Sequence, residues 1–184
     1  MIKDVAAKFE AHYDVQPGDD KTFRLFGGKI IGHDTLKIWN EATIQHFYFG
    51  GNILFDSRAD YLKPEGRQVV QKLGQVIRDH LPFFDEIQIQ GHADTVNIDE
   101  FNLELAARRA MSVFWNFKND CGINPHENLM SVTSFGEYKP VERNKKKQWS
   151  VFDTNKENNT NVGRDRNRRI EIILFYKTST DTLK

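Results

Sequence analysis

Alternating apolar and polar positions along the C-terminal two-thirds of the chain predict its strands. The run Ile87–Gln90 alternates strictly, and such a run is typical of a strand with one apolar face. Three further segments have strand character, and we expect the other core strands at residues 52–55, 128–135 and 168–176.

A helical apolar repeat predicts two long helices between these strands. One begins at Pro64 and stops at Pro82, and its buried face comprises Val69, Val70, Leu73, Val76 and Ile77. The other begins near Asp99 and ends before Gly122, and its core face comprises Leu103, Ala106, Ala110, Val113, Phe114 and Phe117. The order strand–helix–strand–helix–strand–strand predicts the α+β class.

The segment 1–49 is expected to be separate from a main domain at residues 50–177. Residues 1–15 predict a short amphipathic helix, which would either pack on the domain or pair with the same helix of a second subunit. A turn is expected at residues 16–20, and short alternating runs predict extra strands at residues 22–25, 35–38 and 43–47. The polar residues 178–184 predict a flexible tail.

The helix that begins near Asp99 has a second face, beside the core face, that bears polar residues. Asn102, Leu105 and Arg109 recur at i, i+3 and i+7, so they point nearly the same way. Asp94 ends the strand that leads into this helix, and its carboxylate can face Arg109. The aspartate would bind an ammonium group, and the two-pronged guanidinium of the arginine would bind a carboxylate. Together they would suit a small zwitterionic ligand. Spacing alone favours the alternative that Asp94 makes a loop turn and Arg109 a surface ion pair.

Several ordered motifs resemble the OmpA-like C-terminal domain family. The central ones are Gly91-His92-Ala93-Asp94, Phe101-Asn102-x-x-Leu105 and Arg108-Arg109-Ala110. Matching motifs lie on either side, namely Phe55-Asp56-Ser57, Leu62-Lys63-Pro64-Glu65-Gly66, Phe135-Gly136-Glu137-x-x-Pro140 and Gly163-Arg164-x-x-Asn167-Arg168-Arg169-Ile170-Glu171-Ile172. The resemblance covers about residues 50–176, and agreement of several motifs in order is more specific than any one of them.

The resemblance implies both a fold and a ligand. The fold would be a βαβαββ core with helices packed on one mixed sheet. The ligand would be peptidoglycan, bound without cleavage through the diaminopimelate of its stem peptide. By resemblance the site would comprise Asp94 for the ammonium, Arg109 for the carboxylate, Asn102 and Leu105 as further contacts, and Asp56 and Arg168 nearby.

The chain departs from the family pattern in three places. Ala93 replaces a threonine and Ala106 replaces a serine, so binding is expected to be weaker or altered in specificity rather than lost. Residues 141–162 form an insertion, which its low apolar content predicts to be a mobile surface loop with Trp149, Val151 and Phe152 at its middle. The sequence favours a solvated surface insertion over the alternative, in which the basic and aromatic residues of the insertion bind glycan or an anionic partner.

Two biological roles fit the resemblance. One is the periplasmic part of a MotB-like stator subunit, a homodimer held to the inner membrane and to an ion-channel partner by a helix absent from this sequence. The alternative is an outer-membrane or lipoprotein-type wall anchor. No apolar run approaches the roughly 18 residues of a membrane span, so we expect a fragment of a periplasmic protein.

Composition argues against other functions. Lys+Arg and Asp+Glu both number 26, so no charge excess favours nucleic acid. The six histidines lack metal-ligand spacing, and no cofactor is expected. Cys121 is the only cysteine and is expected to be an inert, partly buried thiol, and His92 to make a structural hydrogen bond. We therefore expect a binding protein rather than an enzyme.

Overall fold

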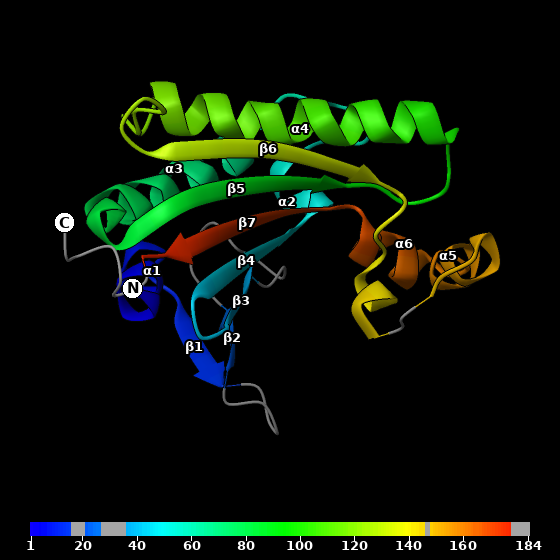
Figure 1. Cartoon of the computed structure of the whole chain (residues 1–184), viewed down its shortest axis with the longest axis horizontal. Coiled ribbons are helices and arrows are strands. Elements are labelled where there is room, and N and C mark those ends of the chain that lie inside the picture. The colour runs from blue at the N-terminus through cyan, green and yellow to red at the C-terminus, as the bar shows by residue number, and fades with distance from the viewer. Residues whose placement is uncertain (16–20, 27–35, 146–147, 178–184) are drawn as a thin grey trace.

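The computed structural model describes residues 1–15, 21–26, 36–145 and 148–177, which form one seven-stranded sheet with helices packed on it (Figure 1). The strands are β1 His12–Val15, β2 Thr22–Phe26, β3 Leu36–Asn40, β4 Ile44–Gly50, β5 Phe84–His92, β6 Leu129–Gly136 and β7 Arg169–Tyr176. The helices are α1 Ile2–Lys8, α2 Gly51–Leu54, α3 Pro64–Asp79, α4 Asp99–Asn119, α5 Val151–Glu157 and α6 Asn161–Asn167, with 3-10 turns at Leu81–Phe83 and Val141–Lys145. The predicted α+β class with a mixed sheet is confirmed.

The sheet has the order β1-β2-β3-β4-β7-β5-β6. All neighbours are antiparallel except β5 and β6, which are parallel. Two adjacent parallel strands need a crossover connection, and α4 supplies it. The carboxyl end of β5 therefore leads directly into the first turns of α4.

The core lies between the sheet and the helices α1, α3 and α4. Ile170, Ile172 and Leu174 of β7 point into it, as the period of two along a strand requires. The helices contribute apolar side chains at helical spacing, among them Val69, Leu73, Ile77, Ala110, Val113 and Phe117. The predicted buried face of the helix at 64–79 is confirmed, since all five of its residues are buried.

The first core strand lies one segment earlier than predicted. The strand expected at residues 52–55 is wrong, because residues 51–54 form the helical turn α2. Residues 44–50 instead form β4, which pairs with β7 along its length. Ile53, Leu54 and Phe55 are buried in the turn, and a short apolar run does not distinguish a strand from a buried helical turn. The sheet thus continues across the expected domain boundary at residues 49 and 50.

The N-terminal helix is shorter than predicted. It ends at Lys8, and residues 12–15 form the edge strand β1. Glu10 adopts a left-handed backbone with φ of 51°, which turns the chain between the two elements. Val5 and Phe9 are fully buried in the core, so the helix packs on its own domain, one of the two roles expected for it.

The insertion contains regular structure, so the expectation of an irregular loop is wrong for the described residues, whereas its mobility stays a prediction. Helices α5 and α6 are capped by the side chains of Ser150 and Thr160, which accept hydrogen bonds from backbone N–H groups. Trp149 donates its Nε1–H to the carbonyl of Arg143 at 2.7 Å and holds the segment as expected. Val151 and Phe152 do not hold it, because both side chains are about three-quarters exposed.

Other expectations fall outside the described residues. These are the linker at 16–20, the tail at 178–184 and the first residue of the strand expected at 35–38. Within the described part of the chain, no helix has the combination of length and apolar character that crossing a bilayer requires.

Candidate ligand-binding site

The site begins where β5 ends, at a close approach between strand and helix. Gly91 lies against α4 so tightly that a Cβ there would come within 2.0 Å of the Ala106 carbonyl oxygen. Glycine is therefore required at this position by packing. The contact brings Asp94, three residues later, beside the first turns of α4.

Asp94 is 4% exposed and is held from two directions. Its Oδ1 accepts a hydrogen bond from the Val96 N–H at 3.1 Å, so the aspartate does make the loop turn that spacing alone favoured. Its Oδ2 forms an ion pair with Arg168, which lies between α6 and β7 and also pairs with Asp165. Asp94 is thus both a turn residue and a charge inside the site.

Arg109 is buried rather than paired at the surface. Its Nε donates to the Ala59 carbonyl at 2.7 Å and its Nη2 to the Asp56 carbonyl at 3.1 Å. The guanidinium lies 5.1 Å from the Phe55 ring centroid, at cation–π distance. Burial, reinforced by the charge of Arg168, lowers the pKa of Arg109. Among the described residues, Nη1 makes no hydrogen bond, in contrast to Nε and Nη2.

Asn102 is 1% exposed and bridges three segments. Its Nδ2 donates to the Asp94 carbonyl at 2.9 Å, the Asn97 carbonyl at 3.2 Å and Glu137 Oε2 at 2.7 Å. The amide N–H groups of Asn102 are therefore used to shape the loop between β5 and α4. Its side-chain oxygen has no partner in the described part of the chain.

All six predicted site residues line one pocket of about 410 Å³. They are Asp56, Asp94, Asn102, Leu105, Arg109 and Arg168. The segment after α2 closes one side of the pocket, and α4 with the end of β5 closes the other. The pocket volume falls within the roughly 300–1,000 Å³ typical of small-ligand sites.

Sequence reasoning missed part of this lining. Arg58, Asn97 and Val96 face the same pocket. Arg58 has a left-handed backbone, with φ of 61°, in the turn that follows the Phe55-Asp56-Ser57 motif. Its position directly after that motif is the sequence feature that could have identified it as a site residue. Three arginines and two aspartates line the pocket, so it carries one excess positive charge.

The groups with catalytic potential lie outside this pocket. His92 is 2% exposed, and among the described residues neither ring nitrogen has a hydrogen-bond partner, so the structural hydrogen bond expected of it is wrong there. Its Nε2 lies 3.8 Å from Glu171 Oε1, beyond hydrogen-bond distance. The ring instead stacks on Phe135 with centroids 5.2 Å apart. Cys121 is 1% exposed, and burial raises the pKa of its thiol to about 11, which makes it a weak nucleophile. No cluster of metal-ligating side chains occurs among the described residues.

The chain is similar to known proteins in both sequence and fold. The Pseudomonas aeruginosa outer-membrane lipoprotein YfiB is 30% identical over 128 residues, which are 70% of this chain and 65% of that protein. The chain therefore spans just under two thirds of the length of this relative.

Two solved structures have the same fold at low sequence identity. The periplasmic domain of Helicobacter pylori MotB superposes with a TM-score of 0.61 and 20% identity, covering 80% of this chain and 83% of that one. The cell wall anchor of the T6SS from Pseudomonas aeruginosa superposes with a TM-score of 0.61 and 19% identity, covering 77% and 88%. A family model described as the OmpA family matches residues 54–152, more than half of the sequence. The chain therefore belongs to the OmpA family.

Proposed function

We propose that this chain binds peptidoglycan noncovalently, through the diaminopimelate of its stem peptides, and so anchors an envelope protein to the cell wall. The observation that carries the proposal is that Asp94 and Arg109 line a single pocket. Both side chains are less than a tenth exposed. Water and salt screen buried charges less than surface charges. Each buried charge therefore attracts an opposite charge on a ligand more strongly.

The pocket chemistry suits the zwitterionic end of diaminopimelate. Its ammonium would share the Asp94 carboxylate with Arg168, and its carboxylate would meet the unpartnered Nη1 of Arg109. Leu105 and Phe55 offer apolar contact to the methylene chain between these groups. The excess positive charge favours a stem peptide, which carries further carboxylates.

The nature of the similar proteins supports a wall-binding role. One similar structure is the cell wall anchor of a secretion system, and another is a MotB periplasmic domain. Because these structures are about one-fifth identical to this chain, their shared fold supports the proposal without transferring their activity. We infer a periplasmic binding protein rather than an enzyme.

A stator role is the finer proposal. The similarity to the Helicobacter pylori domain covers 80% of this chain, so it extends beyond the family segment at residues 54–152. In this role the chain would act as a homodimer attached to a membrane ion channel. The similarity to an outer-membrane lipoprotein supports the alternative of a plain wall anchor. Sedimentation velocity separates the two, because a stator fragment is expected to dimerise as its concentration rises, whereas a plain anchor stays a monomer.

Co-sedimentation with purified sacculi tests wall binding. The folded chain is expected to pellet with sacculi at moderate salt and to release no soluble muropeptides. A folded protein that stays in the supernatant would contradict the proposal. Release of soluble fragments would instead point to an enzyme.

A further inference from the structure

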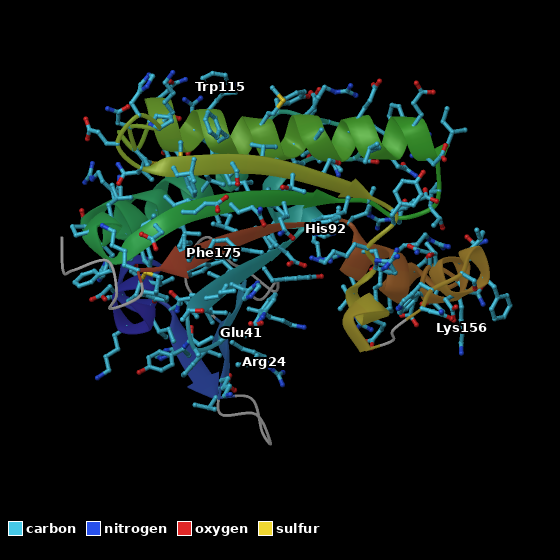
Figure 2. All side chains as sticks on the ribbon, in the orientation of Figure 1. Arg24, Glu41, His92, Trp115, Lys156 and Phe175 are labelled. Atoms are coloured by element: carbon cyan, nitrogen blue, oxygen red, sulfur yellow. The ribbon has the colours of Figure 1, made fainter. Side chains whose placement is uncertain are left out.

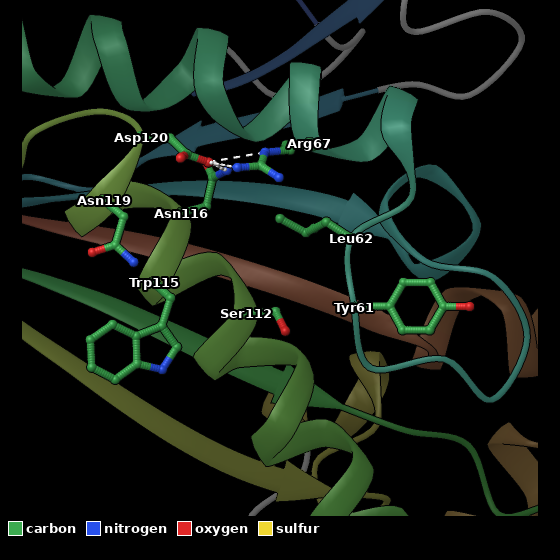
Figure 3. Close-up of a pocket in the computed structure, with 8 residues that line it drawn as sticks. All are labelled: Tyr61, Leu62, Arg67, Ser112, Trp115, Asn116, Asn119 and Asp120. Atoms are coloured by element: carbon green, nitrogen blue, oxygen red, sulfur yellow. Dashed lines mark hydrogen bonds and ion pairs between the residues drawn. The ribbon is translucent and has the colours of Figure 1, made fainter.

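A second pocket lies between α4, the start of α3 and the loop that precedes α3, farther along α4 than Arg109 (Figure 3). It has a volume of about 280 Å³ and is called the α4 groove here. The residues that line it are Tyr61, Leu62, Arg67, Ser112, Trp115, Asn116, Asn119 and Asp120. None of them belongs to the site described above.

The α4 groove has an aromatic residue at each end. Figure 3 shows Trp115 and Tyr61 at opposite ends, with Ser112 and Leu62 between them and the Tyr61 ring pointing away from Trp115. Trp115 is 46% exposed and Tyr61 is 66% exposed, and Figure 2 shows Trp115 on the outer side of α4. Large aromatic surfaces left in water beside a pocket are available for a ligand to cover.

The indole of Trp115 is held in place before any ligand arrives. The ammonium of Lys118 lies 5.0 Å from its ring centroid, and Phe114 makes an edge contact at 5.3 Å. A ring fixed by its neighbours loses little freedom when a ligand covers it, which favours binding.

The polar side of the α4 groove is neutral. Arg67 donates from Nε and Nη2 to one oxygen of Asp120, at 3.0 and 2.8 Å, and Asn116 donates to the same oxygen. Among the residues that line the groove, the one cation is therefore matched by the one carboxylate, unlike in the Arg109 pocket, and the further positive charge of Lys118 lies beside the ring of Trp115. Within the described part of the chain, the second carboxylate oxygen of Asp120 and the amide of Asn119 have no partner. These groups can accept and donate hydrogen bonds to a hydroxyl-rich ligand.

Flat aromatic rings beside neutral hydrogen-bonding groups suit a sugar ring. The C–H bonds on one face of a pyranose carry slight positive charge and rest on the negative face of an aromatic ring, while its hydroxyls bond to amides and carboxylates. An anionic ligand would find the charge of Arg67 already neutralised, and an apolar ligand would strip water from Asn119 and Asp120. The small volume suits one sugar ring rather than a large ligand.

The α4 groove and the Arg109 pocket flank the same loop. The Ala59 carbonyl accepts from Arg109 and the Asp60 carbonyl accepts from Ser112, so this loop is fastened across α4 between the two pockets. Arg109 and Asn116 are seven residues apart, about 10 Å along the helix axis. Three extended residues span roughly 10 Å, so a ligand with a short peptide joined to a sugar can reach both pockets.

We propose that the α4 groove binds a neutral sugar ring of the peptidoglycan glycan strand while the Arg109 pocket holds the attached stem peptide. This inference rests on the proposed function and adds a glycan subsite with Trp115 as its platform. A wall fragment with both sugar and peptide would then bind more tightly than the peptide alone.

The first test follows the three tryptophan indole N–H signals by NMR during titration with chitotetraose, a peptide-free sugar probe. The Trp115 signal is expected to shift, and those of Trp39 and Trp149 serve as internal controls because they lie outside the α4 groove. Absence of a shift at Trp115, or equal shifts at all three signals, would overturn the proposal. A positive result here stands whether or not the stem peptide binds, so the two proposals can fail separately.

The second test compares a disaccharide-peptide with the same peptide lacking sugar. Trp115→Ala is expected to weaken binding of the disaccharide-peptide about fivefold and to change binding of the peptide alone by less than about twofold. Trp115→Tyr keeps a flat ring and is expected to retain most of the affinity. Met111→Ala is the matched control, because Met111 is 45% exposed on the same helix but outside the α4 groove. Equal weakening of both ligands by Trp115→Ala, or of neither, would overturn the glycan assignment.

Discussion

Arg168 and Asp94 form an ion pair that joins the start of β7 to the end of β5 across 74 positions of sequence. Asp94 is almost fully buried, whereas about a third of the Arg168 side chain is exposed. The pair therefore lies at the mouth of the pocket, with its carboxylate inside. A ligand ammonium that reaches Asp94 would add a second cation to this carboxylate rather than meet a free one.

Removing the arginine of this pair is expected to lower the stability of the protein. Arg168→Gln leaves a buried carboxylate without its cation, and we expect the free energy of unfolding to fall by about 1–3 kcal/mol, less than for a fully buried pair. Asp94→Asn in the same chain should recover part of that loss. Urea denaturation of both single variants and the double variant measures the coupling. Additive losses would show that the pair contributes no coupling energy.

Arg109 is expected to support the fold as well as the ligand. Arg109→Lys cannot reach both the Ala59 and Asp56 carbonyls with one planar fork, so we expect the free energy of unfolding to fall by about 1–3 kcal/mol. Arg108→Ala is the neighbouring control. Arg108 is 44% exposed and pairs with Asp60 and Glu104 at the surface, so its loss should cost about 0.5 kcal/mol or less. Equal costs at the two positions would contradict the structural role of Arg109.

His92 is expected to make the protein less stable in mild acid. Burial, with the charges of Arg169 and Lys139, lowers the pKa of His92 well below 6.5. The unfolded chain takes up a proton on this residue near pH 6.5, while the folded chain does not. The unfolded state then binds more protons, so the free energy of unfolding falls as the pH drops below that value.

A phenylalanine at this position isolates the effect of the proton. His92→Phe keeps an aromatic ring beside Phe135 and removes the titrating group. Between about pH 7.5 and pH 5.5, we expect wild type to lose about 1 kcal/mol more unfolding free energy than the variant. Urea denaturation at both pH values makes the comparison. Parallel losses in the two proteins would mean that His92 does not carry the acid sensitivity.

Asn167 is expected to be the residue that fastens the insertion to the core. It is 2% exposed, its oxygen accepts the Val141 N–H at 2.9 Å, and its amide donates to Asn158 at 3.2 Å. Asn167→Ala leaves buried polar groups unpaired, which should cost about 1–3 kcal/mol of unfolding free energy. Asn159→Ala, at an exposed position in the same segment, should cost far less. Thermal or urea unfolding distinguishes the two, and a neutral Asn167→Ala would refute the assignment.

The predicted site residues converge because helical and strand spacing are strict. Asn102, Leu105 and Arg109 share one side of α4 by their i, i+3 and i+7 positions, and the strand before α4 fixes where Asp94 stands. The pattern could not reveal that Arg109 donates to two carbonyls fifty or more positions away. Those bonds depend on how the loop after α2 folds back, which no local spacing encodes.

The predicted core face of α4 is confirmed at Ala106, Ala110, Val113 and Phe117, which are buried, but it is wrong at Leu103. Apolar periodicity assigns Leu103 to the core, yet its side chain is 40% exposed. Asn102, Arg109 and Asn116 occupy buried positions on the same helix because polar partners satisfy them. Apolar periodicity counts only apolar residues. When polar residues are also buried, the face that it predicts is therefore displaced from the face that is actually buried.

The measurement that tests the central claim most directly is a calorimetric titration with two stem peptides. One contains diaminopimelate, and the other has lysine in its place, which keeps the ammonium and removes the side-chain carboxylate. Wild type is expected to prefer diaminopimelate by about 30-fold or more, since each desolvated charged contact is worth roughly 2–4 kcal/mol. Asp94→Asn should weaken binding of both peptides. Arg109→Lys should remove most of the preference, while Arg108→Ala should leave it unchanged.

The preference ratio separates ligand recognition from stability, because a variant that is merely less stable weakens both peptides alike. A preference of about 30-fold in wild type that falls to a few-fold in Arg109→Lys is the result that this account predicts. Equal affinity of wild type for the two peptides, or the same loss of preference in Arg108→Ala as in Arg109→Lys, would contradict the assignment of Asp94 and Arg109 as the two ends of a diaminopimelate site.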